Sequence, residues 1–168
     1  NSDQKMIPVP LPILCRDKNA PSKVQTVLQI MDDAYRNELT ELRADETCYT
    51  YALLTMSRRL NVPEVGELAD AVLVEMKERL MVPNTACYGA AILAWKNVAT
   101  ARECDNREKA VKRALDLLEE MIKAYHRTTK VAVKPTTENY NDVLETLTVS
   151  KSLRATEHAC TLYTSLRQ

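Results

Sequence analysis

The stretches NTACYGAAILAW (residues 84–95) and RALDLLEEM (residues 113–121) contain the pattern that decides the fold of this chain. The first stretch opens its apolar pattern at Tyr88, and the second carries Ala114 and Met121 seven residues apart. Apolar residues that recur at intervals of three, four and seven share one face of an α-helix. The two stretches therefore predict a pair of amphipathic helices.

The same pattern occurs three times along the chain. A tyrosine opens each unit, at Tyr49, Tyr88 and Tyr140. The second helix of each unit carries an alanine and a bulky apolar residue seven positions apart, as Ala69/Met76, Ala114/Met121 and Ala159/Leu166. A repeated helical hairpin cannot bury its apolar face alone and stacks on its neighbours. We therefore expect an all-α fold, an α-solenoid of helix-turn-helix hairpins.

The solenoid is expected to follow an extended arm. Residues 1–21 contain Pro8, Pro10, Pro12 and Pro21, and proline at this density prevents a helix. The helical period begins at residue 22, so we expect a helical-repeat domain over residues 22–168. Its units are a half repeat at 22–44 and repeats at 45–84, 85–136 and 137–168. Loops are expected to take up the extra residues of the longer units, including those between Met121 and Pro135.

Composition supports a helical chain and gives no sign of a membrane segment. The 168 residues are 45% hydrophobic and 27% charged, with two glycines and no phenylalanine. Few glycines and many helix-forming residues favour helix throughout. The apolar runs are far shorter than the roughly 20 residues that span a bilayer, so we expect no membrane insertion.

Neither metal binding nor catalysis is indicated by the sequence. The five cysteines lack CxxC spacing, which favours reduced, buried thiols over a disulfide framework or a zinc site. The chain contains two histidines, His126 and His158, and has no phosphate loop, nucleophile elbow or HExxH motif. We expect a protein that is not an enzyme and has no cofactor.

Charge leaves two interpretations open for nucleic-acid binding. The formal net charge is zero, whereas phosphate neutralisation normally supplies most of the sequence-independent affinity. The segment 122–134 nevertheless contains Lys123, Arg127, Lys130 and Lys134 and no acidic residue. This segment is either a solvated surface or a phosphate track.

The units resemble those of the pentatricopeptide repeat family. The stretches LADAVLVEM (68–76), RALDLLEEM and VKPTTENYNDVLETL (133–147) are similar to that family's second helix ending in Met and its Tyr-led opening helix. The resemblance covers about residues 24–168. The nearest rival is the tetratricopeptide repeat, but its Trp, Gly and Tyr signature near the start of each unit is absent.

The resemblance implies positions that contact RNA. In the family, the residue after the Tyr and the last residue of the unit read one base together. The corresponding residues are Thr50 with Asn84, a pair that resembles an adenine reader, Gly89 with Thr136, and Asn141. Arg58 matches a phosphate-facing basic position, and Lys96 and Lys151 lie close to it. Asn84 and Thr136 are also good helix N-caps, so capping explains them as well as base reading does.

Two functions follow from this resemblance. The first is binding of single-stranded RNA in a mitochondrion or plastid, in RNA processing, stability or translation. The second is a structural subunit of an organellar multi-protein complex, such as a ribosome or membrane assembly, that uses the same fold for protein contacts. In either case the chain is expected to be soluble or peripherally attached to that complex.

Overall fold

The structure is a computed structural model that describes residues 23, 26–31, 33, 44–58, 62–101, 106–128 and 131–150, together with 157, 158, 160, 161 and 164. The predicted arm over residues 1–21 lies outside the described residues. So does most of the predicted second helix of the last unit, including Ala159 and Leu166.

The regular secondary structure of the described residues is entirely helical. Its elements are α3 (Glu46–Ser57), α4 (Val65–Glu78), α5 (Thr85–Thr100), α6 (Arg107–Thr128), the 3-10 helix η2 (Val131–Val133) and α7 (Thr137–Thr148). No strand occurs among the described residues, so the all-α prediction is confirmed for them. None of these helices is long and apolar enough to cross a membrane.

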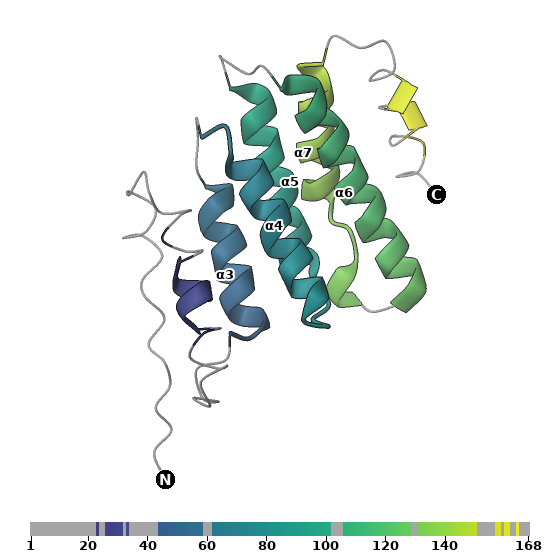
Figure 1. The fold of residues 1–168 in the computed structure, drawn as a ribbon. Helices are drawn as coiled ribbons and strands as arrows, with labels where there is room; N and C mark the ends of the chain where they lie inside the picture. Colours follow the sequence, from purple (N-terminus) through teal and green to yellow (C-terminus); the bar gives the residue numbers. More distant parts are fainter. Residues whose placement is uncertain are drawn as a thin grey trace.

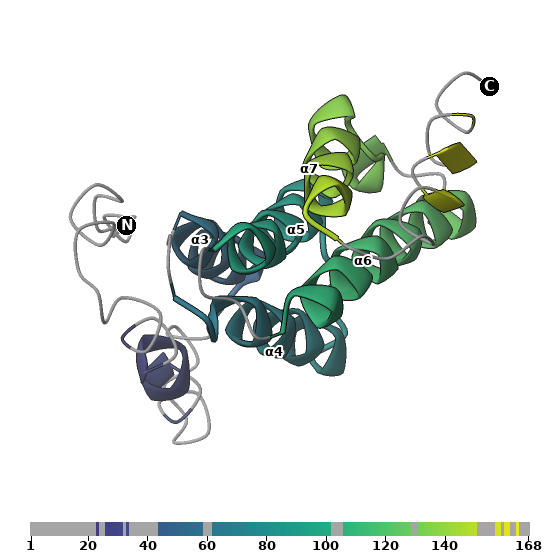
Figure 2. The same ribbon diagram turned by 90° about the horizontal axis from the view of Figure 1, so that it is seen from above.

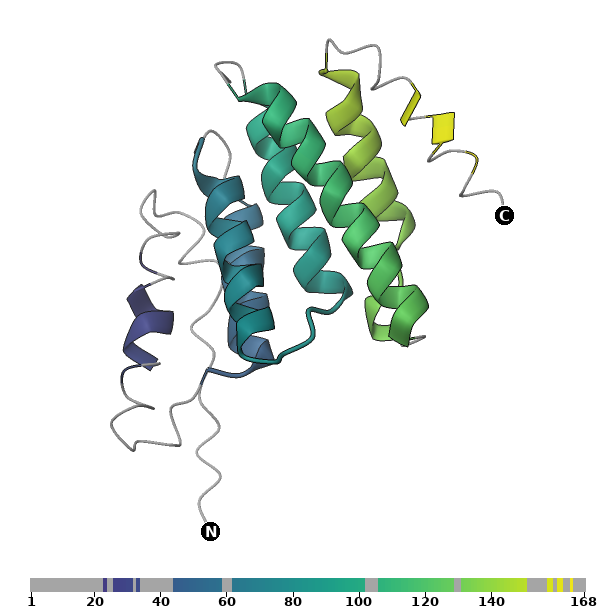
Figure 3. The same ribbon diagram turned by 45° about the vertical axis from the view of Figure 1, so that its right-hand side comes forward.

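The helices form two layers. Figure 2 shows α3, α5 and α7 in one row and α4 and α6 in the other. Helix α5 packs against α3, α4, α6 and α7 and is therefore the centre of the fold. The two layers advance in chain order across the molecule, from α3 and α4 to α6 and α7 (Figures 1 and 3).

The central position of α5 explains its composition. A helix that is covered on several sides must be apolar on several faces. Tyr88, Ile92 and Trp95 are all buried, as are Ala91 and Ala94. Small alanine side chains let neighbouring helices approach closely, while the larger residues fill the space between them.

The apolar periodicity identified the core correctly. The buried residues predicted in the first two units are Tyr49, Leu53, Met56, Ala69, Val72, Leu73, Met76, Tyr88, Ile92, Trp95, Ala114, Leu117, Leu118 and Met121. In α7, Leu147 is buried, whereas Tyr140 and Leu144 are half-buried and pack against the core. One face of each helix therefore contributes to a common core.

The three helices of the first layer begin in the same way. The N-cap residues are Asp45, Asn84 and Thr136, and each side chain accepts a hydrogen bond from the backbone N–H three residues later. Each cap carbonyl also accepts the N–H of the tyrosine four residues later, at N–O distances of 3.3, 3.1 and 3.3 Å for Tyr49, Tyr88 and Tyr140. The capping predicted for Asn84 and Thr136 is confirmed, and Asp45 caps α3 in the same way. Because the caps have fixed spacing to the tyrosines, each tyrosine enters the core at the same helical position.

Helix α6 is longer than the sequence pattern predicts. The segment between Met121 and Pro135 was expected to be a loop, but α6 continues to Thr128 and η2 follows at Val131–Val133. The extension retains an inward face, since Ala124 is buried and Ile122 packs against the core. Apolar contact beyond Met121 therefore keeps the chain helical. The loop prediction was wrong for residues 122–128.

Leu80 lies in an unfavourable backbone conformation where α4 ends. Its φ is 59°, in the left-handed region, and its side chain is 92% exposed. The N–H of Met81 bonds to the carbonyl of Met76 and that of Leu80 to Lys77, which is the Schellman pattern that normally places Gly at this position. Leucine in this region is strained because its Cβ crowds the backbone.

Leu80→Gly is therefore expected to stabilise the protein by about 0.5–1 kcal/mol, since glycine adopts this φ without strain. Urea unfolding measures the change. Leu80→Ala is the matched control: it removes the same exposed side chain but keeps a Cβ, so it should leave the stability nearly unchanged. Equal effects of the two variants would contradict the strain argument.

Candidate functional site

The first predicted reader pair lies between α3 and α5. The Thr50 hydroxyl on α3 lies 3.2 Å from the Cys87 sulfur on α5 and donates to the Glu46 carbonyl at 2.8 Å. The Asn84 side chain caps α5 through Oδ1 and donates from Nδ2 to Glu46 Oε1 at 2.8 Å. The structure therefore brings Thr50 and Asn84 together around Glu46, but both side chains already have hydrogen-bond partners.

The second predicted pair lies between α5 and α7. Thr136 caps α7 in a capping box, in which its N–H and hydroxyl both donate to Asn139 Oδ1, at 2.9 and 2.8 Å. A Cβ added to Gly89 would lie 2.7 Å from Asn139 Nδ2, so Gly89 is close to the same side chain. Asn139 joins the two positions, and sequence reasoning missed it. The repeat pattern could have identified it, because Asn139 immediately precedes Tyr140 as Cys87 precedes Tyr88.

The remaining predicted positions differ in their surroundings. Asn141 on α7 is exposed, and Arg58 is an exposed residue at the C-cap of α3. Lys96 on α5 is held by two carboxylates on α7: its Nζ lies 2.7 Å from Asp142 Oδ1 and 2.6 Å from Glu145 Oε2. Lys151 lies outside the described residues.

The Lys96 cluster is a partly buried ion-pair network. The side chains of Lys96 and Asp142 are 19% and 11% exposed. Burial would lower the pKa of Lys96, but hydrogen bonds and charges from Asp142 and Glu145 outweigh it and raise that pKa. Lys96 is therefore a charged group whose charge is already compensated by two carboxylates. A phosphate would have to displace them.

The cysteines of this layer are not activated nucleophiles. Cys87 is buried and Cys48 half-buried. Burial is the largest influence on both thiols and raises their pKa, so both remain protonated near neutral pH. In the described part of the chain no group of three His, Cys, Asp or Glu side chains is arranged to hold a metal ion.

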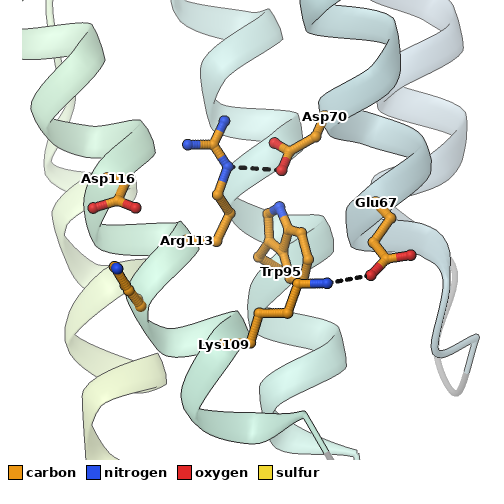
Figure 4. Close-up of a pocket in the computed structure, with 7 residues that line it drawn as sticks. Glu67, Asp70, Trp95, Lys109, Arg113 and Asp116 are labelled. Atoms are coloured by element: carbon orange, nitrogen blue, oxygen red, sulfur yellow. Dashed lines mark hydrogen bonds and ion pairs between the residues drawn. The ribbon is translucent and has the colours of Figure 1, made fainter.

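A second candidate site lies between α4 and α6, on the other layer. An open hollow of about 350 Å³ is lined by Glu67, Asp70, Trp95, Lys109, Lys112, Arg113 and Asp116. Arg113 Nε donates to Asp70 Oδ2 at 2.7 Å, and Lys109 pairs with Glu67 (Figure 4). Sequence reasoning missed this site. The sequence indicates it through two pairs of charges at helical spacing. Glu67 and Asp70 on α4 are three residues apart, and Lys109 and Arg113 on α6 are four apart.

Comparisons with known proteins gave no match: no family model, curated protein or solved structure is significantly similar to this chain.

Proposed function

We propose that this chain is a short pentatricopeptide-type solenoid that serves as a non-catalytic, protein-binding subunit of a larger organellar assembly. The three equivalent helix starts support the repeat. So do the matching contacts between neighbouring first helices, Thr50 with Cys87 and Gly89 with Asn139, which join equivalent positions of successive units.

The observation that carries the proposed role is the pairing of Lys96. RNA binding gains affinity when lysine and arginine neutralise phosphates. Lys96 faces Asp142 and Glu145 instead, and Glu46 lies beside the first reader pair. An RNA backbone along this layer would meet these carboxylates. A protein surface of mixed charge would not suffer this repulsion.

Exposed apolar side chains supply a second argument for protein contacts. Tyr51 and Val74 are 40% and 49% exposed, and Leu80 and Val82 are exposed at the connection between α4 and α5. Aromatic and aliphatic side chains are the usual anchors of protein interfaces. These residues offer contact area in both layers.

Purification of the tagged full-length chain under native conditions, with and without nuclease, tests the proposed role. We expect the chain to remain in a stoichiometric protein assembly after RNA is digested. Recovery with RNA alone, or release from the assembly by nuclease, would reject a protein-binding role.

Binding of single-stranded RNA is the second candidate, because Thr50 and Asn84 lie together as the family's reader positions would. Titration with labelled oligoribonucleotides at several salt concentrations measures it. Affinity that is absent near physiological salt, or that does not rise as salt is lowered, would exclude this candidate.

Two substitutions of Asn84 separate capping from base reading. Asn84→Ala removes the cap of α5 and should lower the free energy of unfolding by about 1 kcal/mol, whereas Asn84→Ser keeps a capping oxygen and should lower it by a few tenths. Both variants lack the carboxamide that would read a base. We expect any RNA affinity to follow stability across the two variants. A large, equal loss of affinity in both would instead assign Asn84 a reading role.

A further inference from the structure

The hollow between α4 and α6 contains two buried polar atoms without hydrogen-bond partners. They are the indole nitrogen Nε1 of Trp95 and the carboxylate oxygen Oδ1 of Asp70. Trp95 is 2% exposed, and its ring lines the hollow. Figure 4 shows the indole nitrogen on the ring edge toward the Arg113–Asp70 pair. One unsatisfied donor and one unsatisfied acceptor therefore belong to the same site.

Leaving these atoms unpaired is unfavourable. A buried donor or acceptor without a partner gives up its hydrogen bonds to water without replacing them, and the loss is greater when the group is charged. The other oxygen of Asp70 is already bound by Arg113, so its charge is compensated. Oδ1 therefore needs only a neutral N–H or O–H donor, and Trp95 needs a neutral acceptor.

The lining of the hollow also favours a neutral occupant. The lining contains three carboxylates, from Glu67, Asp70 and Asp116, and three cations, from Lys109, Lys112 and Arg113. A charged ligand would be attracted by one set and repelled by the other. A neutral group with a donor and an acceptor on adjacent atoms meets both requirements.

We infer that this hollow binds a primary carboxamide. Its carbonyl oxygen would accept from Trp95 Nε1–H, and its NH₂ would donate to Asp70 Oδ1. Neither protein atom is exposed, so the ligand enters when the exposed side chains of Lys109 or Lys112 at the rim change rotamer, a motion of picoseconds to nanoseconds. The inference rests on the proposed protein-binding role, because the carboxamide is assigned to an Asn or Gln side chain of the protein partner.

The indole signal of Trp95 provides a direct test, because the chain contains one tryptophan. Three small probes are titrated into the isotopically labelled full chain while the indole N–H resonance is followed by NMR. Propionamide carries donor and acceptor, N,N-dimethylpropionamide lacks the donor, and propionate carries a negative charge and no donor. We expect a saturable shift with propionamide, a shift about tenfold weaker with the dimethyl amide, and none with propionate.

Two variants, one in the hollow and one outside it, extend the test. In Asp70→Asn, the side-chain oxygen is expected to accept from Arg113, so the side-chain NH₂ faces the NH₂ of the ligand. Two donors then oppose each other, and propionamide binding should weaken about tenfold. Glu119→Gln makes the same charge change on α6 at an exposed position outside the hollow and should leave binding unchanged. If Asp70→Asn does not fold, the comparison of the three probes on the unmodified chain still decides.

Several results would overturn the inference: no shift with propionamide, equal shifts with all three probes, equal weakening in both variants, or an indole N–H whose contact is a bound water only. The chemistry of the hollow is tested separately from the proposed function. If the assembly resists nuclease but propionamide does not bind, the proposed function stands and this inference fails. If propionamide binds but nuclease releases the chain from its assembly, the chemistry of the hollow stands and the proposed function fails.

Discussion

Gly66→Ala is expected to destabilise the protein by about 2 kcal/mol. A Cβ at Gly66 would lie 2.5 Å from two ring carbons of Trp95, closer than carbon atoms can approach. Trp95 is buried among α4, α5 and α6, so its ring cannot move away without disturbing the core. Overpacking of this kind costs typically 1–3 kcal/mol. The better helix propensity of alanine offsets little of it, because Gly66 lies in the first turn of α4.

Gly89→Ala is the matched control, because Gly89 is the chain's other glycine and also lies in a helix. There the new Cβ would meet the Asn139 side-chain amide at 2.7 Å, and a side-chain end can move. Loss of the α7 capping box, about 1 kcal/mol, would be offset by the gain of about 1 kcal/mol from replacing glycine inside α5. Thermal and urea unfolding of both variants measure the difference. A Gly66→Ala variant as stable as the parent chain would show that Trp95 can rearrange.

The core could be predicted from sequence because its signal is local. Each helix places its buried residues at spacings of three, four and seven, and each cap stands four residues before its tyrosine. The end of α6 was missed because the Ala114 to Met121 frame covers only part of the helix. Ala124 and Ile122 continue the inward face beyond that frame, and this extension was readable in the sequence.

The surroundings of the candidate site could not be predicted, because they depend on contacts between distant segments. Lys96 lies close to a phosphate-facing position of the family pattern, but its partner Asp142 is 46 residues away and reaches it only when α7 packs on α5. Arg113 and Asp70 are likewise 43 residues apart. Local patterns give the face of a helix on which a charge lies and do not give the charge that opposes it.

Lys96→Met is expected to lower the free energy of unfolding by about 2 kcal/mol. The substitution leaves the Asp142 carboxylate, whose side chain is 11% exposed, without its cation. Removing one partner of a fully buried pair costs about 3–5 kcal/mol, and the partial exposure here and that of Glu145 reduce this cost. Asp142 anchors α7 on α5, so amide exchange in α7 should accelerate most.

Two further variants identify the source of this loss. Lys109→Met removes a pair whose side chains are 58% and 56% exposed, and it should cost less than about 0.5 kcal/mol. Adding Asp142→Asn to Lys96→Met neutralises the orphaned carboxylate and should recover part of the stability. If the double variant is as unstable as the sum of the single ones, the two groups are not coupled and the packing of the lysine stem accounts for the loss.

The contribution of Lys96 should also disappear at alkaline pH. Its pKa is raised in the folded protein, against the lowering effect of burial, by Asp142 and Glu145. A raised pKa means that the stabilisation is complete below the ordinary lysine value of about 10.4 and is lost as pH rises through the folded value. The stability difference between the parent chain and Lys96→Met should therefore be constant from neutral pH to about pH 10 and shrink above it. Tyrosines that titrate in the same range are common to both proteins and cancel in this difference, so a gap that persists at high pH would place the effect in packing and not in charge.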